Sequence, residues 1–111
     1  MPHKRNGFII IFMTAPSKKE ACAIITSLIH KRLVACGSSV SGVDSIYRWR
    51  SKIERAREVL VILKTRESLF TAAAAEIERL HSYEVPEIIA VPVAAGSEKY
   101  LAWVNKNVSM R

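Results

Sequence analysis

The sequence predicts an α+β fold: a four-stranded antiparallel sheet with two helices on one face and a further helix at the C-terminal end. Apolar runs of strand length and segments of helical periodicity follow one another in the order βαββαβ. Right-handed crossovers fold this order into a ferredoxin-like sandwich. A chain of 111 residues holds one such domain. We therefore expect a basic N-terminal tail over residues 1–6 and a single domain over residues 7–111.

The first strand and the first helix have clear boundaries. Residues 7–14 form a continuous apolar run, which is typical of a central strand covered on both faces. After Pro16, Ser17 and Glu20 have the spacing of a capping box and predict the start of a helix. Apolar residues at helical spacing then give this helix one buried face: Ala21, Ile24, Ile25, Leu28 and Ile29.

The middle of the chain predicts a long hairpin. The second strand begins at residues 33–36, bends within the glycine- and serine-rich residues 37–42, and then resumes. Ser51 is the predicted turn, and the third strand returns over residues 53–64. Strand periodicity places Tyr47 and Trp49 on one face of this hairpin.

The last third of the chain predicts a helix, a strand and a short helix. Thr65 or Ser68 is the expected cap of the second helix, whose buried stripe is Leu69, Ala73, Ile77 and Leu80. A turn at residues 81–86 leads to the fourth strand over residues 88–93, where Pro92 indicates a sheet edge or a strand end. The last helix begins at residues 96–97.

The length of the hairpin predicts a partner. Each of its strands spans about ten to twelve residues, or up to about 35 Å at about 3.3 Å per residue. A domain of this size has a radius of gyration of only about 13 Å. Tyr47, Trp49 and Ile53 therefore lie beyond the reach of their own core. We expect another copy of the chain to cover them, in a closed cyclic oligomer that also protects the sheet edges.

Composition narrows the class of protein. Half of the residues are hydrophobic and 24% are charged, which excludes a disordered chain. The net charge of +7 permits an acidic partner but does not require one, because the cations are spread along the sequence. Two cysteines, Cys22 and Cys36, form no disulfide framework and favour the cytoplasm. No apolar run has membrane-spanning length, so we expect no membrane insertion.

Motifs of catalysis and of nucleic-acid binding are missing from the sequence. It contains no nucleophile elbow, no phosphate-binding glycine loop and no HExxH, so we expect no enzyme and no organic cofactor. RNA-recognition motifs share the βαββαβ order, but their third strand carries stacking aromatics and a glycine. The third strand here has neither, so we expect no nucleic-acid partner.

Candidate metal ligands are scattered rather than spaced as a motif. Cysteine favours copper(I), and imidazole suits copper(II) or zinc. Cys22 and Cys36 are more often packing residues than ligands. His81 is the most interesting candidate, because Glu84 and Glu87 follow closely in the sequence.

Six short segments between Ile9 and Val104 form a set that is specific in this order, although each segment alone is weak. They are residues 14–16 (TAP), 31–36 (KRLVAC), 45–49 (SIYRW) with 52–54 (KIE), 62–65 (ILKT), 81–87 (HSYEVPE) and 100–103 (YLAW). Together they resemble the CutA divalent-cation tolerance family.

The resemblance implies a homotrimer joined through long hairpins, similar to the PII signalling proteins, with a role in tolerance of divalent metals and of copper above all. It implies no catalytic reaction. By position, the inter-subunit cleft of the family corresponds to Tyr47, Trp49, Lys52, Lys64, His81, Tyr83, Glu87 and Trp103. The metal candidates are His81, Glu87 and Cys36.

Four residues depart from the family pattern, and the first is Gly37, which follows Cys36 where an asparagine or a similar residue is usual. Ser82 follows the histidine where a proline is usual, and Ser51 occupies a hairpin turn where a glycine is usual. We expect both changes to loosen their turns. Met13 stands where one bacterial type of copper site has a cysteine.

The sequence thus predicts a cytoplasmic homotrimer of the CutA type. It would bind copper, another divalent cation or a small polar ligand at inter-subunit clefts. The alternative is a PII-like signalling or scaffolding protein that acts through protein partners.

Overall fold

Four strands and three helices follow one another in the predicted order. The computed structural model describes residues 6–110. The strands are β1 (Phe8–Ala15), β2 (Cys36–Trp49), β3 (Lys52–Arg66) and β4 (Ile88–Pro92). The helices are α1 (Lys18–His30), α2 (Phe70–Leu80) and α3 (Glu98–Lys106), and a 3₁₀ turn (Glu67–Leu69) precedes α2. The sheet order is β2-β3-β1-β4 with antiparallel pairing throughout, which confirms the ferredoxin-like α+β fold. Of the expected tail only Asn6 is described, so the division between residues 1–6 and 7–111 stays a prediction.

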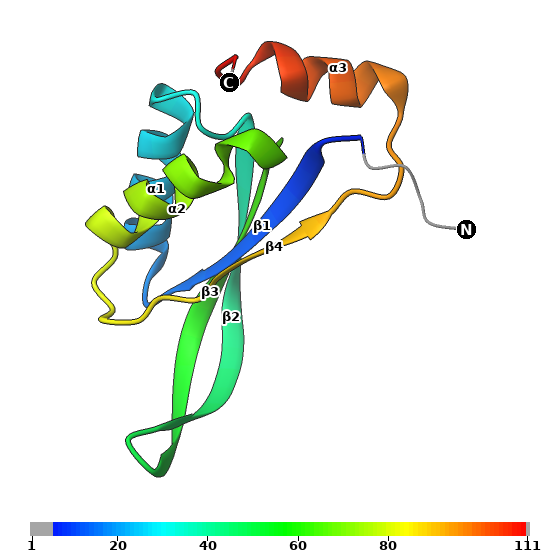
Figure 1. Ribbon diagram of the computed structural model, residues 1–111. Coiled ribbons are helices and arrows are strands. Elements are labelled where there is room, and N and C mark those ends of the chain that lie inside the picture. Colours follow the sequence, from blue (N-terminus) through cyan, green and yellow to red (C-terminus); the bar gives the residue numbers. More distant parts are fainter. Residues whose placement is uncertain (1–5, 111) are drawn as a thin grey trace.

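The helices α1 and α2 cover one face of the sheet (Figure 1). Burial in β1 alternates strictly, so that Ile9, Ile11 and Met13 enter the core. The expectation that β1 is covered on both faces is not met within one chain, because α1 and α2 form a single layer. We call the opposite side of the sheet the open face. Its apolar residues, assigned by strand alternation and register, are Ile10, Phe12, Val40, Leu60, Ile62, Ile89 and Val91.

The hairpin of β2 and β3 projects far beyond the helices (Figure 1). Its strands contain 14 and 15 residues, and the radius of gyration is 14.8 Å, above the value of about 13 Å for a compact domain of this length. Tyr47 is 42% exposed, Trp49 is 37% exposed and Ile53 is 64% exposed. The predicted overreach of the hairpin is confirmed.

Both irregularities predicted for the hairpin occur. The register of β2 against β3 shifts between Val40 and Val43, and Gly42 lies there with a φ of +77°. At the tip, Arg50 and Ser51 have φ values of 51° and 68°, which define a two-residue turn of type I′. This turn matches the twist of the strands. It places two residues that have a Cβ in the left-handed region, which costs about 1 kcal/mol or more for each.

The start of the second helix differs from the prediction. Neither Thr65 nor Ser68 caps it, because β3 continues to Arg66 and the chain enters α2 through the 3₁₀ turn. Thr65 is fully buried, and its hydroxyl donates to the carbonyl of Leu33 at 2.7 Å. The threonine therefore satisfies a polar group of the core instead of a helix end.

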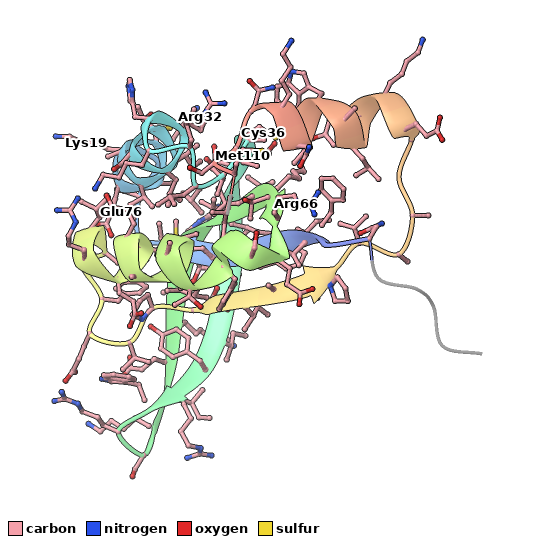
Figure 2. All side chains as sticks on the ribbon, turned by 45° about the horizontal axis from the view of Figure 1, so that its top comes forward. Lys19, Arg32, Cys36, Arg66, Glu76 and Met110 are labelled. Atoms are coloured by element: carbon pink, nitrogen blue, oxygen red, sulfur yellow. The ribbon has the colours of Figure 1, made fainter. Side chains whose placement is uncertain are left out.

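A buried carboxylate joins α1 to α2. Glu76 is 7% exposed and accepts hydrogen bonds from Arg79 at 2.7 and 2.9 Å and from Ser27 at 2.7 Å. Lys31 lies 3.1 Å away, and Figure 2 shows Glu76 on α2. The bonds from Arg79 and Ser27 hold the pKa of Glu76 well below its usual range. The charged form of this side chain thus stabilises the helical layer.

We predict that Glu76→Gln lowers stability at pH 7 and that its deficit shrinks in acid. The pKa of Glu76 is depressed in the folded state, so its stabilisation is complete above the ordinary glutamate pKa of about 4.3. Below that pH the unfolded chain takes up a proton that the folded chain does not, and the wild-type advantage falls. Urea unfolding at pH 7 and pH 3, at one protein concentration, measures the difference. Glu78→Gln, an exposed site on the same helix, should behave like wild type, and an equal deficit of Glu76→Gln at both pH values would contradict the prediction.

Candidate ligand-binding cleft

A cavity of about 620 Å³ lies between the hairpin, the end of β1 and the 81–87 loop, which joins α2 to β4. Strand β1 contributes Thr14, and strand β3 contributes Glu58. The other lining residues are Ser45, Ile46, Tyr47 and Trp49 of β2, and Ser82, Tyr83, Glu84, Val85 and Glu87 of the loop.

Four of the predicted cleft residues meet in this cavity: Tyr47, Trp49, Tyr83 and Glu87. Alternation along β2 places both of its aromatics on one face. The 81–87 loop approaches that face and adds Tyr83 and Glu87. Lys52 does not line the cavity, although it pairs directly with Trp49 at the tip of the hairpin.

Glu58 was missed by the sequence analysis. It is 6% exposed, and its Oε2 accepts a hydrogen bond from the hydroxyl of Tyr83 at 2.7 Å. Burial, together with the neighbouring carboxylate of Glu58, raises the pKa of Tyr83 far above its usual value. The sequence did contain a signal for a functional carboxylate at this position. Glu58 stands directly before the apolar run of residues 59–63, where the strand enters the core.

His81 anchors the start of the 81–87 loop from a position outside the cavity. Its side chain is fully buried and does not line the cavity. Nε2 lies 2.7 Å from the carbonyl oxygen of Thr14, and Nδ1 accepts a hydrogen bond from the backbone N–H of Tyr83 at 3.1 Å. These two contacts together specify the tautomer with its hydrogen on Nε2. His81 therefore fixes the loop against the end of β1.

A second anchor of the loop comes from α1. Ser17 caps α1 as predicted, accepting the N–H of Glu20 at 3.1 Å. In a capping box the carboxylate of Glu20 would accept the backbone N–H of Ser17. Here it accepts both the backbone N–H and the hydroxyl of Ser82, each at 2.9 Å. The expected loosening at Ser82 does not occur, because serine supplies two donors where a proline would supply none.

The remaining predicted residues form a second group at the far end of the sheet. Cys36 pairs with Lys64, and its Sγ lies 3.5 Å from the hydroxyl of Tyr100, a residue of the first turn of α3. Figure 2 labels Cys36 close to this helix. Tyr100 stacks on Trp103 with ring centroids 5.8 Å apart. Its contact with Cys36, aided by burial, raises the pKa of Tyr100 to about 12.

The two groups do not meet within the described part of one chain. Glu58 is the cavity residue of β3 and precedes Lys64 by six residues, so at about 3.3 Å per residue the two lie about 20 Å apart along the strand. The metal candidates are divided in the same way, with Cys36 in the second group and His81 and Glu87 beside the cavity. Over residues 6–110, no three His, Cys, Asp or Glu side chains form a group that could hold a metal ion.

None of the helices in the described part of the chain is both long and apolar enough to cross a bilayer.

Comparison with known proteins gives consistent matches over nearly the whole chain. The family model for the CutA1 divalent ion tolerance protein matches residues 9–107. The "Divalent-cation tolerance protein CutA" of Thermus thermophilus is 38% identical over 98 residues, covering 88% of this chain and 95% of that protein. The crystal structure of CutA from Xylella fastidiosa superposes with a TM-score of 0.91 at 36% identity, covering 94% of this chain and all of that one.

A plant relative is longer than this chain. The "Protein CutA, chloroplastic" of Arabidopsis thaliana is 35% identical over 99 residues, which are 89% of this chain and 54% of that protein. The chain thus spans about half the length of that relative and nearly all of the bacterial one. The bacterial relative is named for tolerance of divalent cations and not for a reaction. Because the family model and these identities extend over most of its length, the chain belongs to the CutA1 divalent ion tolerance protein family.

Proposed function

We propose that the chain forms a homotrimer whose inter-subunit clefts bind copper, another divalent cation or a small polar ligand in the service of metal tolerance. The observation that carries this proposal is the division of the cleft residues into two groups, with Lys64 about 20 Å along β3 from the cavity residue Glu58. In this proposal a second chain brings Lys64, Cys36 and Trp103 next to the cavity. Membership in a family named for divalent ion tolerance supports the metal role.

Assembly is supported by the apolar surface that one chain leaves bare. On the open face Ile89 is 54% exposed, while Val40 and Val91 are also exposed. Fully burying one large aliphatic side chain stabilises by about 1.5–3 kcal/mol, so covering this face and the hairpin supplies a large driving force. Strands β2 and β4 are the two sheet edges, and a closed ring of three subunits protects both.

The ligand is held in this proposal by groups of different chemistry. Glu87 is exposed on the rim of the cavity and offers a carboxylate, while Cys36 of a neighbouring subunit offers a soft thiolate. Lys64 offers a cation to any anionic part of a ligand. His81 has to break its bond with the N–H of Tyr83 before Nδ1 can bind a metal, so binding there would move the 81–87 loop.

A cytoplasmic location and the lack of catalysis remain parts of this proposal. Two free cysteines, Cys22 and Cys36, support a reducing compartment. The alternative PII-like signalling or scaffolding role is favoured by the projecting hairpin, whose tip is open to a protein partner. Copurification with and without copper separates the two roles, because a scaffold retains its partner in the absence of metal.

We predict that Ile89→Lys dissociates the trimer. A lysine on the open face would place an unpaired charge in the interface, at a cost of several kcal/mol. Light scattering should give three times the 12.4 kDa chain mass for wild type and a value near one chain for the variant. Ile29→Lys is the matched control, because Ile29 is 42% exposed but lies on α1, away from the open face. A wild-type monomer, or equal dissociation by both variants, would contradict the proposed interface.

We predict that copper(II) binds the wild-type assembly and that removing a proposed donor weakens binding by at least about tenfold. Calorimetric titration of wild type, His81→Ala, Glu87→Gln and Cys36→Ser tests each residue. Affinity should fall with acidity, because imidazole, thiolate and carboxylate bind metals in their deprotonated forms. Equal affinity of wild type and His81→Ala would remove His81 from the ligand set, and the same criterion applies to the other two residues.

A further inference from the structure

We propose that the cavity beside the 81–87 loop binds a small organic cation that carries ammonium or guanidinium groups. This inference rests on the proposed function in one respect, because the cavity forms part of the same cleft. It narrows the small polar ligand to one chemical class.

The charge of the cavity is opposite to that of the chain. The sequence has 17 Lys and Arg against 10 Asp and Glu. Nevertheless, Glu58, Glu84 and Glu87 line this cavity, whereas none of the Lys, Arg or His residues among residues 6–110 does. General electrostatic attraction would bring anions to this protein, so a cation held here has to be recognised by the cavity itself.

Glu58 is the carboxylate of the cavity that a bound cation would stabilise most, because it is buried and has a single hydrogen-bond donor. It is more than nine-tenths buried, and among the described residues only the hydroxyl of Tyr83 donates to it, at Oε2. Every fully enclosed side-chain oxygen in the described part of the chain has a partner, so the unpartnered Oε1 of Glu58 is not enclosed, and Glu58 is a residue of the cavity lining. A buried carboxylate with a single donor is costly, and a charge-assisted hydrogen bond from a ligand relieves that cost.

The aromatic lining favours an organic cation. Tyr47, Trp49 and Tyr83 border the cavity, and aromatic faces attract ammonium and guanidinium groups. The chain itself provides an example at the hairpin tip. The guanidinium of Arg50 lies 5.5 Å from the centroid of the Trp49 ring and 3.4 Å from the carboxylate of Glu84.

The spacing of the carboxylates indicates an extended ligand. Within residues 6–110 they do not come together as a group that could hold a metal ion. The cavity volume of about 620 Å³ falls within the range of about 300–1,000 Å³ that is usual for organic ligands. An aliphatic polyamine fits both the separated carboxylates and the volume of the cavity, because it is an extended organic molecule whose positive charges lie apart from one another.

Calorimetric titration of the wild-type protein with spermidine and with 1,4-diaminobutane tests the inference. We expect saturable binding with a dissociation constant below about 1 mM, and no binding of 1,4-butanediol, which has the same length without charge. Glu58→Gln keeps the shape of the side chain and should weaken spermidine binding by about tenfold or more. Glu78→Gln removes the same charge from an exposed site on α2 and should bind like wild type.

Light scattering on the same samples separates this inference from the proposed assembly. A trimer that binds neither amine overturns the cation site and leaves the trimer intact, as would occur if a neighbouring side chain filled the cavity. A monomer that binds spermidine supports the site and contradicts the assembly. If Glu58→Gln does not fold, Glu87→Gln on the exposed rim decides: a loss of about tenfold supports the site, and unchanged affinity overturns it.

Discussion

The structure depends on one constraint, which is that two helices cover only one face of a sheet that is apolar on both. Ile11 and Met13 enter the core beneath α1 and α2, while Ile10 and Phe12 alternate with them toward the open face. The hairpin also carries uncovered apolar side chains beyond the core, where Ile53 is largely exposed. A chain built in this way has a well-packed half and a half whose apolar side chains one chain leaves exposed. The cleft lies at the boundary between the two.

The cleft at this boundary is lined in part by the 81–87 loop, and hydrogen bonds tie that loop to the regular elements around it. His81 ties the 81–87 loop to β1, and Glu20 ties it to α1 through Ser82. Tyr83 then reaches across the cavity to Glu58 on β3. Three elements that are distant in the sequence therefore position the lining residues. This arrangement explains how a loop without regular structure can present aromatic and carboxylate groups in fixed places.

Local rules were sufficient to predict most of the fold. The capping serine at Ser17, the bend near Gly42 and the turn at Ser51 each follow from residue chemistry, and apolar runs of strand length predicted the strands. The start of α2 could not be predicted in this way, because Thr65 and Ser68 look like caps in sequence. Whether Thr65 caps a helix or satisfies Leu33 depends on packing, which no local pattern contains.

The site was predictable only in part. The aromatics of β2 and the 81–87 loop were identified, since strand alternation and a family resemblance both point to them. Glu58 and the role of Glu20 were not, because each forms contacts with a segment more than twenty residues away. The pairing of Lys64 with Cys36 was not predicted either, because the register of the long hairpin depends on the bulge between Val40 and Val43.

Amide hydrogen exchange of the wild-type protein tests the central claim most directly, namely that copies of the chain cover what one chain leaves open. An isolated hairpin is marginal in water and exchanges rapidly, whereas a hairpin packed between subunits is protected. We predict that residues 43–56 exchange as slowly as those of β1 at a protein concentration where the assembly is intact. Exchange of residues 43–56 within seconds, while β1 stays protected under the same conditions, would contradict the account.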